Sequence, residues 1–151
     1  MPPESRHVRP PWEDRFQTPT ADDLIRCLEN EQRQAFELAR GSLLEIDSLE
    51  EHLAWRGIPW RWSFSYRLAD QNEPPLAYLV PEPGHPRLVL PLAADAVSSQ
   101  ALSRIPKSLR GPIIHAPRVG ETRWTAWELN APGQVSDLIE FAQASLGLVR
   151  A

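Results

Sequence analysis

Apolar residues recur every three or four positions between Thr20 and Gly41, which is the spacing of one face of an α-helix. Asp23 follows Thr20 at the distance of a capping box, so the helix is predicted to begin at Thr20. Glycine is common just after a helix, and Gly41 therefore marks its predicted end. The apolar face consists of Leu24, Ile25, Leu28, Ala35, Phe36 and Ala39.

A second, shorter helix is predicted from Ser48 to Trp55. Glu50 and Glu51 would lie in its first turn, where negative charge complements the helix dipole. A glycine and a proline follow within four residues, and they are typical of a helix end.

The pattern changes to a period of two at Trp60, which predicts a strand. Its two faces differ in chemistry. The apolar face consists of Trp60, Trp62, Phe64, Tyr66 and Leu68, and the polar face of Arg61, Ser63, Ser65 and Arg67.

Two further strands, Leu76–Val80 and Arg87–Leu90, follow after short turns rich in proline, so the three strands should form an antiparallel meander. The remaining predicted elements are a helix at Ala93–Leu102, a short helical piece at Pro106–Leu109, a strand at Val119–Leu129 and a last helix that starts near Pro132. The inward face of the last helix is predicted to be Val135, Leu138, Ile139, Ala142 and Leu146.

The predicted order is ααβββαβα, without a repeated βαβ unit. This order indicates an α+β fold, with an antiparallel sheet of about four to five strands and helices packed on one face. Residues 20–151 should form one domain. Residues 1–19 contain five prolines and are predicted to be an extended or disordered arm, whose second half Trp12 and Phe16 could attach to the domain.

Composition narrows the classes of function. The net charge of −4 argues against general binding to nucleic acid, which needs a basic surface. No apolar run reaches the roughly 20 residues of a membrane span, and residues 1–20 lack the apolar segment of a signal peptide. Cys27 is the only cysteine, so no intramolecular disulfide forms. We expect a cytoplasmic protein.

The sequence lacks the motifs of common enzymes. The four histidines and Cys27 show no metal-ligand spacing, and neither a Gly-x-Ser-x-Gly elbow nor a glycine-rich phosphate loop occurs. We therefore predict a protein without enzymatic activity and without a cofactor.

The polar face of the predicted strand is the best candidate for a binding site. Arg61 and Arg67, with Ser63 and Ser65 beside them, could hold a carboxylate or phosphate by charge-assisted hydrogen bonds. Trp127, or Trp124 if the register is shifted by one residue, could stack on an arginine. The expected partner is a small anionic ligand or a protein, and a second copy of the chain is the alternative that would make a homodimer.

Three short segments carry a resemblance to a known family. They are Glu51–Pro59, in which Trp55 precedes Gly57 and Pro59, then Leu88–Pro91, and finally Trp124–Leu129 followed by Asp137–Phe141. The chain resembles the YdhG-like domains of unknown function over about residues 21–148, and the resemblance implies an α+β layout.

Some members of that family are similar to frataxin and are regarded as iron chaperones, which gives an alternative function. The matching acidic positions on the first helix are Asp22, Asp23, Glu29, Glu31 and Glu37. Carboxylate oxygens are hard ligands, which are suited to binding iron. Arg26, Arg33 and Arg40 are interleaved with them at spacings that allow ion pairs within the helix, and this favours an ordinary solvated helix face.

Overall fold

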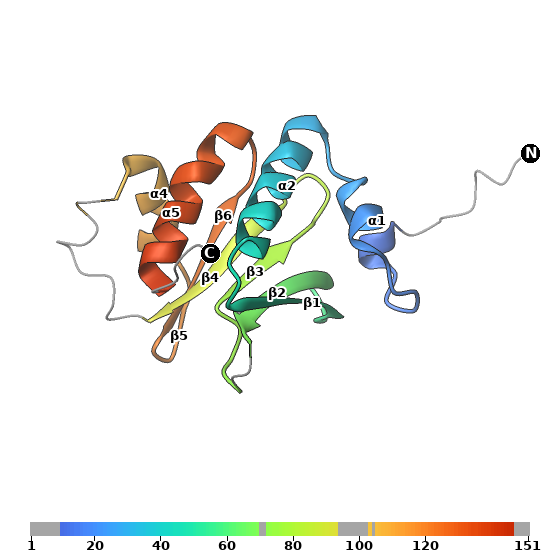
Figure 1. Cartoon of the computed structure of the whole chain (residues 1–151), viewed down its shortest axis with the longest axis horizontal. Helices are drawn as coiled ribbons and strands as arrows, with labels where there is room; N and C mark the ends of the chain where they lie inside the picture. The colour runs from blue at the N-terminus through green and yellow to red at the C-terminus, as the bar shows by residue number, and fades with distance from the viewer. Residues whose placement is uncertain (1–9, 70–71, 94–102, 104, 147–151) are drawn as a thin grey trace, which may run out of the picture.

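The computed structural model describes residues 10–69, 72–93, 103 and 105–146, and these form an α+β fold (Figure 1). Two helices precede four strands, and a further helix, two strands and a last helix follow. The helices are α1 (Ala21–Ile25), α2 (Asn30–Leu44), α4 (Lys107–Ile114) and α5 (Val135–Leu146). The strands are β1 (Leu49–Trp55), β2 (Trp62–Leu68), β3 (Ala77–Val80), β4 (Arg87–Ala93), β5 (Arg118–Val119) and β6 (Thr122–Glu128).

All six strands pair antiparallel in one sheet, in the order β1-β2-β3-β4-β6-β5. The predicted α+β class and antiparallel sheet are confirmed. The sheet is slightly larger than predicted because the described chain forms a strand at each edge, β1 and β5, that the sequence pattern did not indicate.

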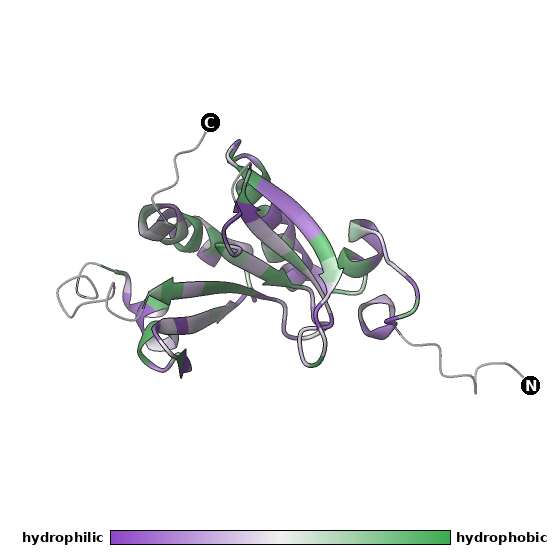
Figure 2. Ribbon diagram, turned by 90° about the horizontal axis from the view of Figure 1, so that it is seen from below, coloured by the Kyte–Doolittle hydropathy of each residue, from purple (hydrophilic) through white to green (hydrophobic). Residues whose placement is uncertain are grey.

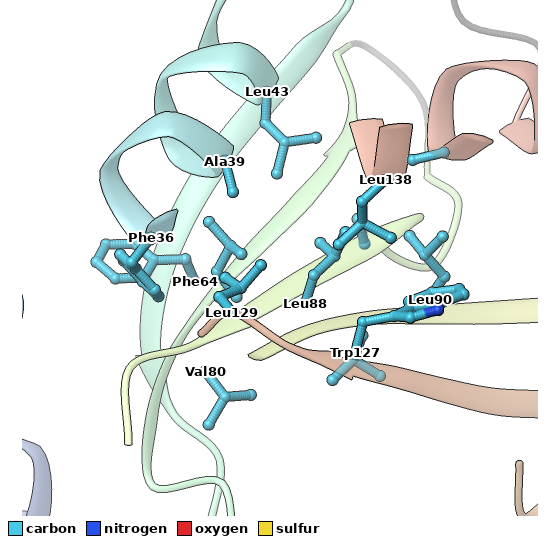
Figure 3. Packing of buried hydrophobic residues seen from close by; sticks show 14 of the residues in the cluster. Phe36, Ala39, Leu43, Phe64, Val80, Leu88, Leu90, Trp127, Leu129 and Leu138 are labelled. Atoms are coloured by element: carbon cyan, nitrogen blue, oxygen red, sulfur yellow. The ribbon is translucent and has the colours of Figure 1, made fainter. Parts of the chain in front are cut away.

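The core lies between the sheet and helices α2 and α5, which run side by side over one face (Figure 1). Phe36 of α2 meets Phe64 of β2 with ring centroids 6.0 Å apart, and Leu138 of α5 points to the same layer (Figure 3). The view from below in Figure 2 shows α1 at the opposite end of the molecule from α4 and α5. The described part of the last helix has the predicted inward face, since Val135, Leu138, Ile139 and Ala142 are buried.

The first predicted helix begins as expected but is broken in two. Thr20 caps α1 through the backbone N–H of Asp23, and the Asp23 carboxylate accepts from the backbone N–H of Thr20. The chain leaves helical geometry after Ile25 and resumes it at Asn30. Arg33 stabilises this break, because its guanidinium donates to the carbonyls of Arg26 and Leu28.

The helix predicted at Ser48–Trp55 is wrong, because residues Leu49–Trp55 form strand β1. Seven residues pair with β2, so the backbone groups on that side of the strand are hydrogen-bonded without a helix. Glu50 and Glu51, which were predicted to complement a helix dipole, therefore lie in a strand. Glu51 points to the helix side of the sheet and accepts hydrogen bonds from Arg40 and from Tyr66.

The second half of the chain differs from the prediction in detail. Helix α4 extends beyond the predicted end at Leu109 and contains Gly111 and Pro112. The strand predicted at Val119–Leu129 is a hairpin, because Gly120 adopts a φ of 60° and turns β5 into β6. The helix predicted at Ala93–Leu102 falls almost wholly on residues 94–102, outside the described residues. None of the described helices is long and apolar enough to cross a membrane.

The segment before α1 is attached to the sheet through its tryptophan. Trp12 lies in a 3₁₀ turn (Pro11–Glu13), is only 6% exposed and donates its indole N–H to the carbonyl of Trp60 at 3.1 Å. Trp62 donates in turn to the carbonyl of Asp14 at 2.7 Å. Phe16 is 86% exposed and takes no part in this attachment.

Candidate functional site

The face of the sheet opposite α2 and α5 is called here the open sheet face. Side chains alternate between the two faces along each strand, so strand register decides which residues share it. One row across the sheet on this face consists of His52, Ser65, Tyr78, Val89 and Ala126.

Two residues of the predicted polar stripe lie on this face but are covered. Ser63 is 0% exposed and donates its hydroxyl to the carbonyl of Trp60 at 2.9 Å. Ser65 is 1% exposed and donates to the carbonyl of His52 at 3.4 Å. Neither hydroxyl is therefore available to a ligand.

Arg61 is not part of the stripe at all. It precedes β2 in the β1–β2 loop, with a φ of 53° that breaks the alternation. Its guanidinium pairs with Glu13 at 3.2 Å and lies 5.2 Å from the ring centroid of Trp12. Arg61 thus holds the N-terminal segment against the loop. Arg67, the fourth residue of the stripe, remains partly exposed on the open sheet face.

Trp127 lies on the helix face, where it donates to the carbonyl of Leu109 and contacts Phe141 of α5 at 5.6 Å between ring centroids. Trp124 is the tryptophan of β6 on the open sheet face. Trp124, the alternative in the sequence prediction, is therefore the tryptophan that shares a face with Ser63 and Ser65.

An aromatic cluster lies across the middle of the open sheet face. Trp60 folds back from the β1–β2 loop and meets Tyr78 at 4.8 Å and Trp124 at 6.0 Å, and Tyr78 meets Trp124 at 6.1 Å, all between ring centroids. Edge-on and tilted packing of this kind is favourable for aromatic rings. We call these three residues the aromatic ridge.

Two arginines flank the ridge on the side of β1 and β2. The guanidinium of Arg56 lies 5.5 Å from the ring centroid of Tyr78. The positive charge of Arg67 lowers the pKa of both Arg56 and Tyr78. The Nε atoms of Arg56 and Arg67 are buried and lack a hydrogen-bond partner. Among the described residues, no carboxylate lies within ion-pair distance of either guanidinium. Glu50, opposite Arg67 in the register, instead lies 3.8 Å from His52.

The electrostatics of this arginine pair reflect the lack of a counter-charge. Burial lowers the pKa of Arg56, the nearby Tyr78 opposes that effect, and the like charge of Arg67 adds to it. Burial raises the pKa of Tyr78, while both arginines lower it. An anion between the two guanidiniums would relieve their mutual repulsion.

A pocket of about 410 Å³ lies on the other side of the ridge, open to solvent on one side. Its walls are mostly apolar. They are formed by Trp60, Arg87, Val89, Pro112, His115, Ala116, Pro117, Trp124 and Ala126. Arg87 contributes little charge, because it pairs with Glu82 at 2.6 Å and donates to the carbonyl of His85.

The acidic positions of the first two helices do not gather into a metal site. In the part of the chain that the structure describes, no three His, Cys, Asp or Glu side chains lie close enough together to hold a metal ion. Asp23 is engaged in the cap of α1, and Asp22 and Glu29 belong to no such group. Comparison with known proteins found no matching family model, curated protein or solved structure.

Sequence reasoning missed Arg56 and the aromatic ridge. Had Leu49–Trp55 been interpreted as a strand, Arg56 would have continued the face of His52 and Ala54. Nothing in the local pattern indicated that Trp60 leaves the strand and covers the face of its neighbours.

Proposed function

We propose that this protein is a non-enzymatic binding domain that recognises an anionic group of its partner through Arg56 and Arg67. The observation that supports the proposal is the placement of two guanidiniums beside Tyr78, without a carboxylate partner among the described residues. Arginines at a protein surface usually find a counter-ion or solvent, and these two are partly buried instead.

The chemistry of the pair suits a carboxylate or a phosphate. A guanidinium donates up to five hydrogen bonds in one plane, and charge-assisted bonds to an oxyanion are the stronger kind. The face of Tyr78 holds Arg56 by a cation–π contact, which limits the conformations that a ligand must select. The ridge would exclude water from one side of the bound anion and so strengthen the attraction.

A single cysteine without a disulfide is consistent with a location in a reducing compartment. Cys27 is free and partly buried, and its thiol donates to the carbonyl of Asp23. We therefore place the protein in the cytoplasm.

Binding of two anionic probes tests the proposal. Inorganic pyrophosphate and a hexaglutamate peptide are titrated into the protein while the tryptophan fluorescence is followed, because Trp60 lies next to the site. We expect Arg56→Gln and Arg67→Gln each to weaken binding roughly tenfold, through lost charge-assisted hydrogen bonds. Arg118→Gln is the matched control, since it removes the same charge from an exposed site on β5. Equal weakening by all three variants, or no binding of either probe, would overturn the proposal.

A further inference from the structure

We infer that the partner presents an extended peptide segment, in which an acidic residue and an apolar residue lie four positions apart. This inference rests on the proposed function, since the acidic residue is the group that Arg56 and Arg67 bind. It adds a second point of recognition, the pocket beyond the aromatic ridge.

The distance between the two points fixes the spacing. The arginines belong to the β1 and β2 side of the sheet, and the pocket lies over β4 and β6. From β2 to β6 the order contains three strand spacings of about 4.8 Å, or roughly 14 Å. An extended chain advances about 3.3 Å per residue, so roughly four residues cover this distance.

The pocket favours an apolar side chain over a polar one. Val89, Ala126 and the prolines of its wall offer no side-chain hydrogen-bonding groups to an inserted side chain, and the polar groups of the lining belong to His115, Arg87 and the two indoles. The charge of Arg87 is already balanced by Glu82. A leucine or an aromatic residue would bury apolar surface against these walls and needs no hydrogen-bond partner there.

The shape of the face favours a peptide over a small molecule. A small ligand usually has about 70–90% of its surface buried by its site, and this pocket is open to solvent on one side. The ridge also offers polar groups to a peptide backbone. The indole N–H groups of Trp60 and Trp124 and the hydroxyl of Tyr78 make no hydrogen bond within the described residues, and they are not buried.

The geometry of an extended chain gives the inference a sharp test. Side chains at positions separated by an even number point to the same side of the peptide, and those separated by an odd number point to opposite sides. A spacing of four places both recognition groups toward the sheet. A spacing of three or five directs one of them to solvent.

The experiment compares four peptides by fluorescence anisotropy. Three contain one glutamate and one leucine, placed three, four or five positions after the glutamate, with serine and threonine elsewhere. The fourth has serine in place of the leucine. We expect the spacing of four to bind roughly tenfold more tightly than the other three peptides, which is the gain from burying one leucine.

Two variants of the pocket distinguish this inference from the proposed function. Ala126→Phe fills the pocket from an exposed strand position, and it should abolish the preference for the spacing of four while the serine peptide binds as before. Ala126→Ser leaves the pocket open and should keep the preference. If all four peptides bind equally and Arg56→Gln abolishes that binding, the inference is wrong and the proposed anion site still stands. Binding of pyrophosphate but of no peptide would also overturn it, in favour of a small anionic ligand.

Discussion

Arg40 of α2 and Glu51 of β1 form a two-pronged ion pair, with both N···O distances at 2.9 Å. Tyr66 of β2 donates to the same carboxylate at 2.6 Å, and the guanidinium of Arg40 lies 5.4 Å from the ring centroid of Phe64. The edge strand β1 is thereby joined to the helix layer as well as to β2. Hydrogen bonding to Glu51 raises the pKa of Arg40, so its guanidinium remains charged.

A double-mutant cycle measures the contribution of this ion pair. Arg40→Met and Glu51→Gln are each expected to lower the free energy of unfolding by about 2–3 kcal/mol, because each leaves a partly buried partner without its counter-charge. The coupling energy should be about 1–2 kcal/mol in urea unfolding. The exposed pair Arg118–Glu121 serves as the control, with an expected coupling below about 0.5 kcal/mol. Equal coupling in the two pairs would show that burial adds nothing.

Stability should fall at alkaline pH through Tyr66. Burial, and then the charge of Glu51, raise the pKa of Tyr66 well above the ordinary value of 10.0. A pKa raised by folding stabilises the fold fully below the unfolded value, and this contribution is lost as pH rises beyond it. We expect the free energy of unfolding of the native protein to fall more steeply above pH 10 than that of Tyr66→Phe. Parallel curves for the two proteins would contradict this assignment.

The N-terminal segment offers a matched pair of aromatic substitutions. Trp12→Ala removes a buried side chain and its hydrogen bond to Trp60, and should destabilise the protein by about 2–4 kcal/mol. Phe16→Ala, four residues later, changes an exposed ring and should stay within about 0.5 kcal/mol of the native protein. Thermal unfolding of both variants is the measurement. A large effect of Phe16→Ala would mean that the segment makes contacts other than those described.

Glu50 lies opposite Arg67 on the same face and carries the charge that an anionic partner would meet. Glu50→Gln is expected to strengthen binding of hexaglutamate about threefold, since two exposed like charges repel by roughly 0.6 kcal/mol. The increase should vanish in 0.5 M salt, a concentration chosen to screen exposed charges. Weaker binding by Glu50→Gln would instead indicate that Glu50 is a ligand contact.

The sequence pattern predicted the strands whose faces differ clearly in polarity, and it failed where a polar residue faces inward. Phe64 and Tyr66 were correctly expected on an apolar face, as were the buried positions of the first and last helices. The strand β1 was missed because Glu51 interrupts its apolar side, and only the folded molecule supplies Arg40 and Tyr66 as partners.

The candidate site was less predictable, because it depends on residues far apart in the sequence. Alternation correctly placed Ser63 and Ser65 on one face, but it carries no information about what covers that face. Trp60 does so, and its position depends on the loop that Arg61 closes by donating its backbone N–H to the carbonyl of Gly57. Arg56 and Tyr78 meet only after β1, β2 and β3 have paired.

The β1–β2 loop supplies both Arg56 and Trp60, and β1 lies at the edge of the sheet. Edge strands and loops open more readily than the centre of a domain, so local opening of this hairpin would dismantle the anion site while β4 and β6 stay folded. Occupancy of the site and closure of the hairpin are therefore thermodynamically linked. Bound partner would slow amide hydrogen exchange in β1 by the same factor by which it depopulates the open hairpin.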